Sequence, residues 1–221
     1  MQKVKIVASV DYPIQQARIE LPSVAISADF IELRGDLNPE FGSEQLRDCF
    51  SGRLIYSLLD KKHGGGFDGS RVERSVYLVD AARQFDFVDL DADQDLHQDT
   101  LSAIPAGRRI ISWHGGCASG AEMRRALDRA LSVPAAMYKL VTTASRSGDE
   151  LEPLILLNER SRTDVIAFAA GERGLWTRLL APLFGAPVVF GSAQSTWSPN
   201  DDPPVRILVE DYGFPDLQPV T

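Results

Sequence analysis

Residues 30–36 read Phe30-Ile31-Glu32-Leu33-Arg34-Gly35-Asp36, a short run in which every second residue from Glu32 onward is charged. Successive side chains of a β-strand point to opposite faces, so Glu32, Arg34 and Asp36 would share one face. Charged residues such as these are uncommon in an apolar core. We therefore expect a strand whose charged face leads, at its C-terminal end, into a functional cavity.

Seven more apolar runs of strand length are spread along the 221 residues. They are rich in Val, Ile, Phe and Leu, which is typical of buried strands. The eight expected strands cover residues 4–10, 30–33, 53–59, 87–90, 108–113, 137–143, 165–169 and 187–190. Strands that alternate with helical or irregular stretches indicate parallel βαβ units, and eight strands can close a barrel. The sequence thus predicts an α/β fold, one (β/α)₈ TIM barrel over residues 1–221, with compact crossovers at 11–29 and 91–107.

Helical spacing between these runs supports the same architecture. Residues 70–84 place Val72, Val76, Val79 and Ala82 on one face, which we expect to pack against the strands. Similar patterns cover residues 120–133, 147–161 and 174–184.

A histidine and a lysine stand near the ends of two neighbouring strands. The fifth strand ends Ser112-Trp-His114, and the sixth reads Met137-Tyr-Lys139-Leu-Val-Thr-Thr143. The carboxyl ends of barrel strands meet at one mouth, so Glu32, Arg34, His114 and Lys139 should converge there. Inside the barrel, desolvation and neighbouring cations should lower the pKa of Lys139 and make a neutral amine available for imine formation.

Structural interpretations of the same residues remain open. Lys139 could lie on the outer face with its ammonium reaching solvent. His114 could be a hydrogen-bonded structural histidine, and Glu32 with Arg34 could be an ion pair that closes a barrel layer. The appearance of all of them at successive strand ends favours a functional site.

In this order, several segments resemble type I 3-dehydroquinate dehydratases, from about Lys5 to Pro199. The segments that carry the resemblance are Glu32-Leu-Arg34-x-Asp36, Gly64-Gly-Gly-Phe-Asp-Gly69, Val88-Asp-Leu-Asp91, Ser112-Trp-His114, Tyr138-Lys139, Gly174-Leu-Trp-Thr-Arg178, Leu183-Phe-Gly-Ala-Pro187 and Phe190-Gly191. Each segment alone is a weak signal, and the ordered set is specific.

The resemblance implies a lyase that dehydrates 3-dehydroquinate to 3-dehydroshikimate without a metal or organic cofactor. Lys139 matches the lysine that forms a Schiff base with the substrate ketone, and His114 matches the general acid and base. Arg178 matches the residue that clamps the substrate carboxylate, while Glu32 and Arg34 match residues that hydrogen-bond the ring hydroxyls. The substrate is then a small anionic hydroxy-keto acid, and a homodimer would fit the family.

The pocket departs from the family pattern at several positions. Leu59 stands where the family has a substrate-contacting arginine, and His63 stands where it has the glutamate that orients the catalytic histidine. Trp197 and Asp201 fall where a serine and a glutamine would touch the substrate, and Asp36 is expected behind the substrate contacts. These changes predict poor turnover of 3-dehydroquinate, or preference for a less hydroxylated or differently shaped keto acid.

Four aspartates in alternation, at positions 89, 91, 93 and 95, invite a divalent-cation interpretation. The segment lacks the glycine and the twelfth-position glutamate of an EF-hand loop. We interpret it as a strand end that runs into a solvated turn, and expect no metal site in the chain.

Charge and hydropathy limit the partners. The formal net charge is −8, and the isoelectric point is near 4.9, which argues against nucleic acid and anionic membrane surfaces as partners. No apolar run approaches the roughly 18–20 residues that span a bilayer, and the N-terminus has the pattern of a strand rather than a signal peptide. With two cysteines and no disulfide framework, we expect a cytoplasmic protein.

Two other functions remain alternatives. One is a different Schiff-base barrel enzyme, such as an aldolase-like lyase that acts on another keto acid. The other is a catalytically weak barrel that binds a metabolite or a partner protein. Turnover of 3-dehydroquinate separates both from a dehydratase.

Overall fold

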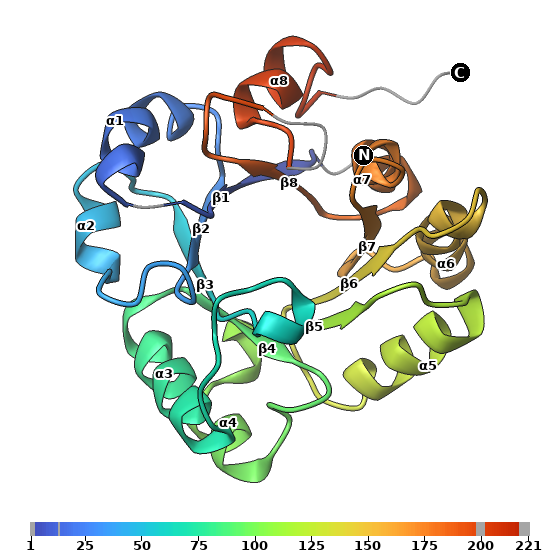
Figure 1. The fold of residues 1–221 in the computed structure, drawn as a ribbon, viewed down its shortest axis with the longest axis horizontal. Helices are drawn as coiled ribbons and strands as arrows, with labels where there is room; N and C mark the ends of the chain where they lie inside the picture. Colours follow the sequence, from blue (N-terminus) through green and yellow to red (C-terminus); the bar gives the residue numbers. More distant parts are fainter. Residues whose placement is uncertain (1–2, 13, 198–201, 217–221) are drawn as a thin grey trace.

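Eight parallel strands form a ring with helices outside it (Figure 1) in the computed structural model, which describes residues 3–12, 14–197 and 202–216. The strands are β1 (Lys5–Val10), β2 (Phe30–Arg34), β3 (Arg53–Ser57), β4 (Phe87–Asp91), β5 (Arg109–Gly115), β6 (Met137–Thr143), β7 (Val165–Ala170) and β8 (Val188–Ser192). Their order is β7-β6-β5-β4-β3-β2-β1-β8, and every ladder is parallel. The predicted (β/α)₈ fold is confirmed.

Strands β7 and β8 are the two ends of this sheet, and no backbone ladder joins these two described strands. Aromatic side chains pack there instead, because the Phe168 and Phe190 ring centroids lie 6.3 Å apart. The barrel is therefore nearly closed, with a seam filled by side chains.

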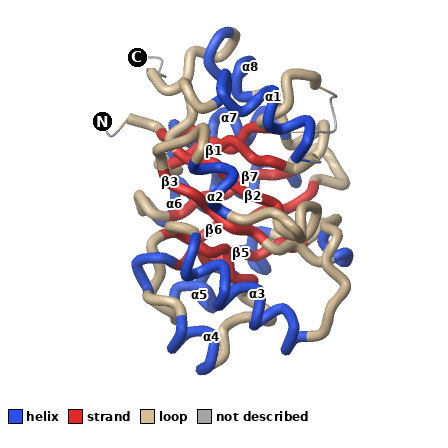
Figure 2. The backbone as a smooth tube through the Cα atoms, turned by 90° about the vertical axis from the view of Figure 1, so that its left-hand side faces the viewer, coloured by secondary structure: helices blue, strands red, loops and turns tan. Residues whose placement is uncertain are grey.

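The helices surround the strands, as the side view in Figure 2 shows. They are α1 (Ile14–Val24), α2 (Ser43–Arg47), α3 (Arg71–Gln84), α4 (Gln98–Ala103), α5 (Gly120–Leu131), α6 (Glu152–Arg160), α7 (Leu175–Leu180) and α8 (Val205–Glu210). Short 3₁₀ turns are η1 (Lys61–His63), η2 (Ala106–Arg108), η3 (Asp149–Leu151) and η4 (Ala181–Phe184). None of the helices in the described residues is long and apolar enough to cross a membrane.

The barrel interior is built in layers, as alternation along each strand requires. An apolar cluster fills the interior, and it contains Val7, Phe30, Ile55, Phe87, Ile110, Met137, Ile166, Phe168, Val188 and Phe190. Two residues further along β2 and β6, the same inward face carries Glu32 and Lys139. The polar residues that the sequence places near strand ends thus rest on an apolar floor.

Helix α3 buries only part of the face that its apolar spacing predicts. Ala82 is buried, but Val72 and Val76 are 74% and 63% exposed, and the other buried positions include Arg74 and Leu78. The prediction is wrong for these two valines because valine spacing takes no account of a buried arginine. Arg74 forms ion pairs with carboxylates under the helix, and these contacts fix its rotation.

Candidate active site

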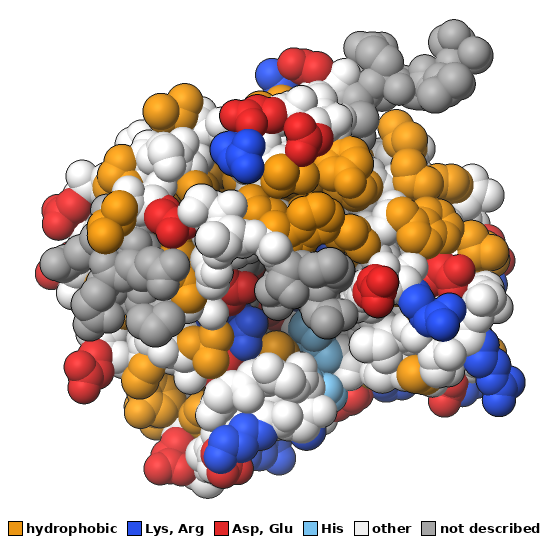
Figure 3. Space-filling model, turned by 45° about the horizontal axis from the view of Figure 1, so that its top comes forward, with side chains coloured by type: hydrophobic (Ala, Val, Ile, Leu, Met, Phe, Trp, Pro, Cys, Tyr) orange, Lys and Arg blue, Asp and Glu red, His pale blue; other side chains and the backbone are white. Residues whose placement is uncertain are grey.

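A cavity of about 350 Å³ opens at the carboxyl ends of the strands. Glu32, Arg34, His63, His114, Lys139 and Arg178 all line it. In Figure 3, histidine side chains are visible in a hollow near the centre of the face, with basic and acidic side chains beside them. The structure therefore brings together residues from strands and turns far apart in the sequence.

Of the predicted site residues at positions 197 and 201, the structure describes only the first. Trp197 is 41% exposed and is not among the residues that line the cavity. Asp201 lies outside the described residues.

Lys139 points into the barrel and is 6% exposed, so the interpretation that its ammonium reaches solvent from the outer face is wrong. Its Nζ lies 2.5 Å from Asp89 Oδ2 and 3.7 Å from Glu32 Oε1. The same nitrogen lies 5.2 Å from the centroid of the Phe190 ring. The lysine is thus held between two buried carboxylates above an aromatic wall.

The expected pKa shift of Lys139 is also wrong in direction. Burial opposes the charge on the ammonium, but the carboxylates of Asp89 and Glu32 outweigh it and raise the pKa of Lys139. The side chain is therefore charged at rest. Imine formation needs a proton acceptor beside it, and Asp89 is in hydrogen-bond contact.

Glu32 is fixed by serines from both neighbouring strands. Ser57 Oγ donates to Glu32 Oε1 at 2.5 Å, and Ser9 Oγ donates to the other carboxylate oxygen. The predicted alternative of a Glu32–Arg34 ion pair is wrong, because Arg34 pairs with Asp36. The ion-pair partner of Glu32 is therefore Lys139 and not Arg34.

Asp36 orients Arg34 from behind the cavity wall. Arg34 Nε and Nη2 donate to the two Asp36 oxygens at 2.9 and 2.7 Å. The backbone N–H groups of Leu59 and Gly66 also donate to this carboxylate, at 3.2 and 2.9 Å. Although burial opposes its charge, these contacts hold the pKa of Asp36 below its usual range. Arg34 is thereby locked with its charge at the cavity.

His114 and His63 face each other with ring centroids 5.8 Å apart. On its other side His63 Nε2 lies 3.6 Å from Asp91 Oδ2. Burial first, then the charges of Lys139 and His63, hold the pKa of His114 well below its ordinary value. The imidazole of His114 is therefore neutral at pH 7 and can accept a proton.

The three glycines after η1 place His63 over the mouth. Gly64 ends this turn with φ +83°, in the left-handed region that glycine adopts readily. A Cβ on Gly65 would lie 2.0 Å from the Leu59 carbonyl oxygen, so no larger residue fits there. The chain can therefore fold back tightly beside β3, and Lys62 joins the cavity wall in the same turn.

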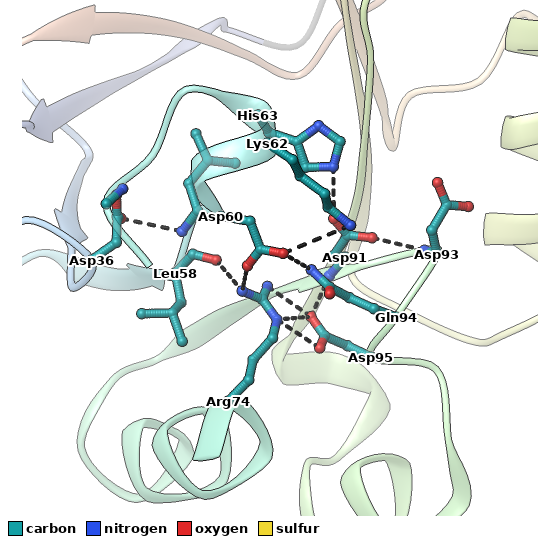
Figure 4. A network of polar contacts seen from close by, with 12 residues as sticks. Asp36, Leu58, Asp60, Lys62, His63, Arg74, Asp91, Asp93, Gln94 and Asp95 are labelled. Atoms are coloured by element: carbon teal, nitrogen blue, oxygen red, sulfur yellow. Dashed lines mark hydrogen bonds and ion pairs between the residues drawn. The ribbon is translucent and has the colours of Figure 1, made fainter. Parts of the chain in front are cut away.

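Three of the four aspartates at the end of β4 are buried, contrary to the solvated turn expected from the sequence. Asp89, Asp91 and Asp95 are 5%, 4% and 1% exposed, whereas Asp93 is exposed as expected. Asp89 forms an ion pair with Lys139. Asp91 faces His63, and Asp95 accepts from Arg74 (Figure 4). The prediction is wrong for the three buried aspartates because their partners come from other segments of the chain.

Arg178 is buried against the seam of the barrel. Its guanidinium carbon lies 4.2 Å from the Phe168 ring centroid, and Nη1 donates to the Phe190 carbonyl at 3.5 Å. Asp202 Oδ1 lies 2.5 Å from Nη2. The planar guanidinium is thus set at the cavity edge with a carboxylate already on it.

The family model described as type I 3-dehydroquinase matches residues 8–213. The chain belongs to this family. A 3-dehydroquinate dehydratase of Dehalococcoides mccartyi is 30% identical over 178 residues, covering 75% of this chain and 76% of the relative. One from Methanothermobacter thermautotrophicus is 30% identical over 177 residues, covering 77% and 78%.

Solved structures of the type I 3-dehydroquinase family share the barrel. The enzyme from Clostridium difficile superposes with a TM-score of 0.77 at 19% identity, covering 92% of this chain and 89% of that one. The enzyme from Aquifex aeolicus gives a TM-score of 0.74 at 16% identity, covering 97% and 100%. At these identities the likeness establishes the fold.

Sequence reasoning missed three residues that shape this type I 3-dehydroquinase site: Asp89, Arg74 and Lys62. Asp89 had a signal, because it alternates with Asp91 at a strand end, where functional side chains of barrels gather. Arg74 had none, since it stands in an ordinary helical pattern. Lys62 had no signal either, because it lies in a charged turn whose direction depends on the following glycines.

Proposed function

We propose that this protein dehydrates 3-dehydroquinate to 3-dehydroshikimate through an imine on Lys139. The observation that carries the proposal is the placement of Lys139, 6% exposed, between Asp89 and Glu32 in the cavity of a type I 3-dehydroquinase barrel. If this buried position served only the packing of the barrel, an apolar residue could fill it at a lower desolvation cost than a lysine.

The first step activates the amine. The ammonium of Lys139 gives a proton to Asp89, whose Oδ2 lies 2.5 Å away. The neutral nitrogen then adds to the substrate ketone carbon, and protonated Asp89 returns its proton to the former carbonyl oxygen, which leaves as water. The product is an iminium cation, which the carboxylate of Glu32 and the restored carboxylate of Asp89 stabilise as they stabilised the ammonium.

The second step is elimination, and it is assigned to His114. The iminium withdraws electrons from the neighbouring carbon, so neutral His114 can remove a proton from it and leave an enamine. The resulting imidazolium gives this proton to the hydroxyl on the next carbon, which departs as water. Hydrolysis of the imine consumes one water, releases the enone product and restores Lys139, so the net reaction loses one water.

Arginines orient the substrate. Arg178 is the proposed clamp for the carboxylate, because its planar fork can donate two parallel hydrogen bonds. Glu32 and Arg34 are the proposed partners of the ring hydroxyls. Leu59 lines the same cavity, and its side chain cannot hydrogen-bond a substrate hydroxyl. This favours a keto acid with fewer hydroxyls as the second candidate substrate.

The imine is directly testable. Borohydride reduction during turnover of 3-dehydroquinate should fix a mass adduct on Lys139, and Lys139→Met should abolish both adduct and turnover. Lys61→Met is the matched control, since this lysine is 60% exposed and does not line the cavity. Turnover without any adduct on Lys139 would show that another chemistry operates.

A carboxylate at position 63 should change the pH profile. In His63→Glu, a negative charge beside the His114 ring favours the imidazolium and raises the pKa of His114. Activity needs neutral His114, so the acid limb of kcat/KM should move to higher pH. His63→Gln removes the charge of His63 without adding a negative one, so it should move the limb upward by less than His63→Glu, and His97→Gln should leave the limb unchanged. An unmoved limb in His63→Glu would mean that another group limits the rate in acid.

A cytoplasmic location and a homodimeric state belong to the same proposal. They rest on the resemblance to the family and on the free thiols of Cys49 and Cys117. Light scattering of the purified protein tests the dimer, and a monomer in dilute solution would count against it.

A further inference from the structure

The guanidinium of Arg178 carries an internal carboxylate. Asp202 Oδ1 lies 2.5 Å from Nη2 of Arg178, and both residues line the cavity. In the described part of the chain, Asp202 is the only carboxylate that forms an ion pair with Arg178. The Nη2 atom of Arg178, which could donate to a ligand carboxylate, is therefore already paired with Asp202.

Asp202 is held less firmly than the carboxylates that neutralise the other buried cations of the cavity. The side chains of those carboxylates are 0%, 6% and 2% exposed for Asp36, Asp89 and Asp95. The side chain of Asp202 is 31% exposed. Ion pairs with an exposed partner are weak, so this one can be exchanged.

The backbone after Asp202 is anchored by hydrogen bonds to β8. Ser192 N donates to the Pro203 carbonyl at 2.9 Å, and Ser192 and Pro204 form an isolated parallel bridge. This anchor lies on β8, the strand next to the Arg178 site. The tether keeps the Asp202 carboxylate close to the arginine, and a rotation of the side chain would be enough to release it.

A second carboxylate repels Asp202 in its present place. Asp11 accepts a hydrogen bond from Ser192 Oγ at 3.3 Å, and burial together with the charge of Asp202 raises the pKa of Asp11. The two acids therefore lie close enough to repel each other. This repulsion further weakens the hold of Asp202 on Arg178.

We propose that Asp202 is an internal stand-in for the substrate carboxylate: it occupies Arg178 at rest and is displaced when a ligand brings its own carboxylate. A carboxylate ligand can offer both of its oxygens to the planar guanidinium in parallel hydrogen bonds. A neutral ligand cannot replace the Asp202 carboxylate as the counter-ion of Arg178. Asp202 then stays in place and leaves less room for the ligand. Asp202 would thus select for anionic substrates. The inference rests on the proposed clamp role of Arg178.

Calorimetric titration with quinate tests the exchange without catalysis. Quinate keeps the carboxylate and ring of 3-dehydroquinate but has a hydroxyl in place of the ketone, so no imine forms. Asp202→Asn and Asp202→Ala should bind quinate at least about fivefold more tightly than the native protein, because the competing anion is gone. Quinamide, the uncharged amide, should show no such gain. Asp211→Asn, an exposed acid on the same C-terminal segment, is the matched control and should change neither affinity.

Thermal unfolding gives an independent reading. Without Asp202, buried Arg178 has lost its counter-charge, so ligand-free Asp202→Ala should melt below the native protein. Saturating quinate should raise its Tm by more than it raises the native Tm. Arg178→Lys should lose the quinate gain in the Asp202→Ala background.

The outcomes separate this inference from the proposed function. Tighter quinate binding in the Asp202 variants supports the stand-in even if 3-dehydroquinate is not turned over, which would count against the dehydratase alone. Equal or weaker quinate binding, or no binding at all, overturns the stand-in, and dehydratase turnover would survive that result. An equal gain for quinamide would also overturn it, because removal of bulk would then explain the effect.

Discussion

Replacement of His114 with alanine is expected to lower kcat for 3-dehydroquinate by about 10²–10⁴-fold, the range for loss of a positioned general acid and base. His114 lines the cavity with Lys139, and its depressed pKa leaves the imidazole neutral and able to accept a proton. The elimination should fail while the imine still forms, because Lys139 has Asp89 as a separate proton acceptor. Single-turnover kinetics with borohydride trapping should therefore show an adduct on Lys139 that accumulates without product.

His97→Ala is the matched control for that measurement. His97 lies outside the cavity, and its Nε2 shares a hydrogen bond of 3.0 Å with Thr100. Its removal should leave kcat within about twofold, the size of effect expected for a histidine that takes no part in proton transfer. A small loss of kcat in His114→Ala would assign the proton transfer to His63 or to a carboxylate. Loss of the adduct in His114→Ala would show that His114 also serves imine formation.

The strand-level prediction succeeded because its signals are local. Alternation along residues 30–36 places Glu32 and Arg34 on one face whatever the rest of the chain does, and the structure has both at the cavity. The same holds for Lys139 on β6, whose neighbours Tyr138 and Leu140 pack outward against the helices. Once the strands are parallel and closed into a ring, their carboxyl ends must share a mouth.

The electrostatics could not be predicted in the same way. The charge state of Lys139 depends on Asp89, 50 residues away in the sequence, and nothing near Lys139 reports that contact. The rotation of α3 depends on Arg74 in the same manner, through partners at Asp60 and Asp95. Sequence patterns place side chains on faces, while ion pairs between distant segments set their charges.

The resemblance to the family reached residues that patterns alone would leave undecided. The hydrophobic spacing of the helix that contains Arg178 does not single out this arginine. Only the ordered motif marks it as a site residue. The structure adds what the motif does not contain, namely that Asp202 already holds this arginine. Similarly, the motif marks His63 as a departure, and the structure shows its two neighbours, Asp91 and His114.

The largest effect on stability is expected for Arg74→Met, at about 3–5 kcal/mol of unfolding free energy at pH 7. Arg74 is 3% exposed and donates to Asp95 at 2.8, 2.9 and 3.1 Å, to Asp60 at 2.8 Å and to the Leu58 carbonyl at 2.6 Å (Figure 4). Methionine keeps an unbranched apolar stem but removes the guanidinium, so Asp95, which is 1% exposed, is left as a buried charge without a cation. Urea denaturation measures the loss as a lower midpoint at unchanged slope.

Two further variants show whether the stranded charge is the cause. Arg83→Met lies on the same helix, in a pair with Asp80 whose side chains are 75% and 58% exposed, and it should cost less than about 1 kcal/mol. Adding Asp95→Asn to Arg74→Met removes the uncompensated charge and keeps an acceptor for the Asp91 N–H, which now donates to Asp95 at 2.7 Å. The double variant should therefore be more stable than Arg74→Met alone. A deficit that Asp95→Asn deepens would mean that lost packing rather than the buried charge governs this site.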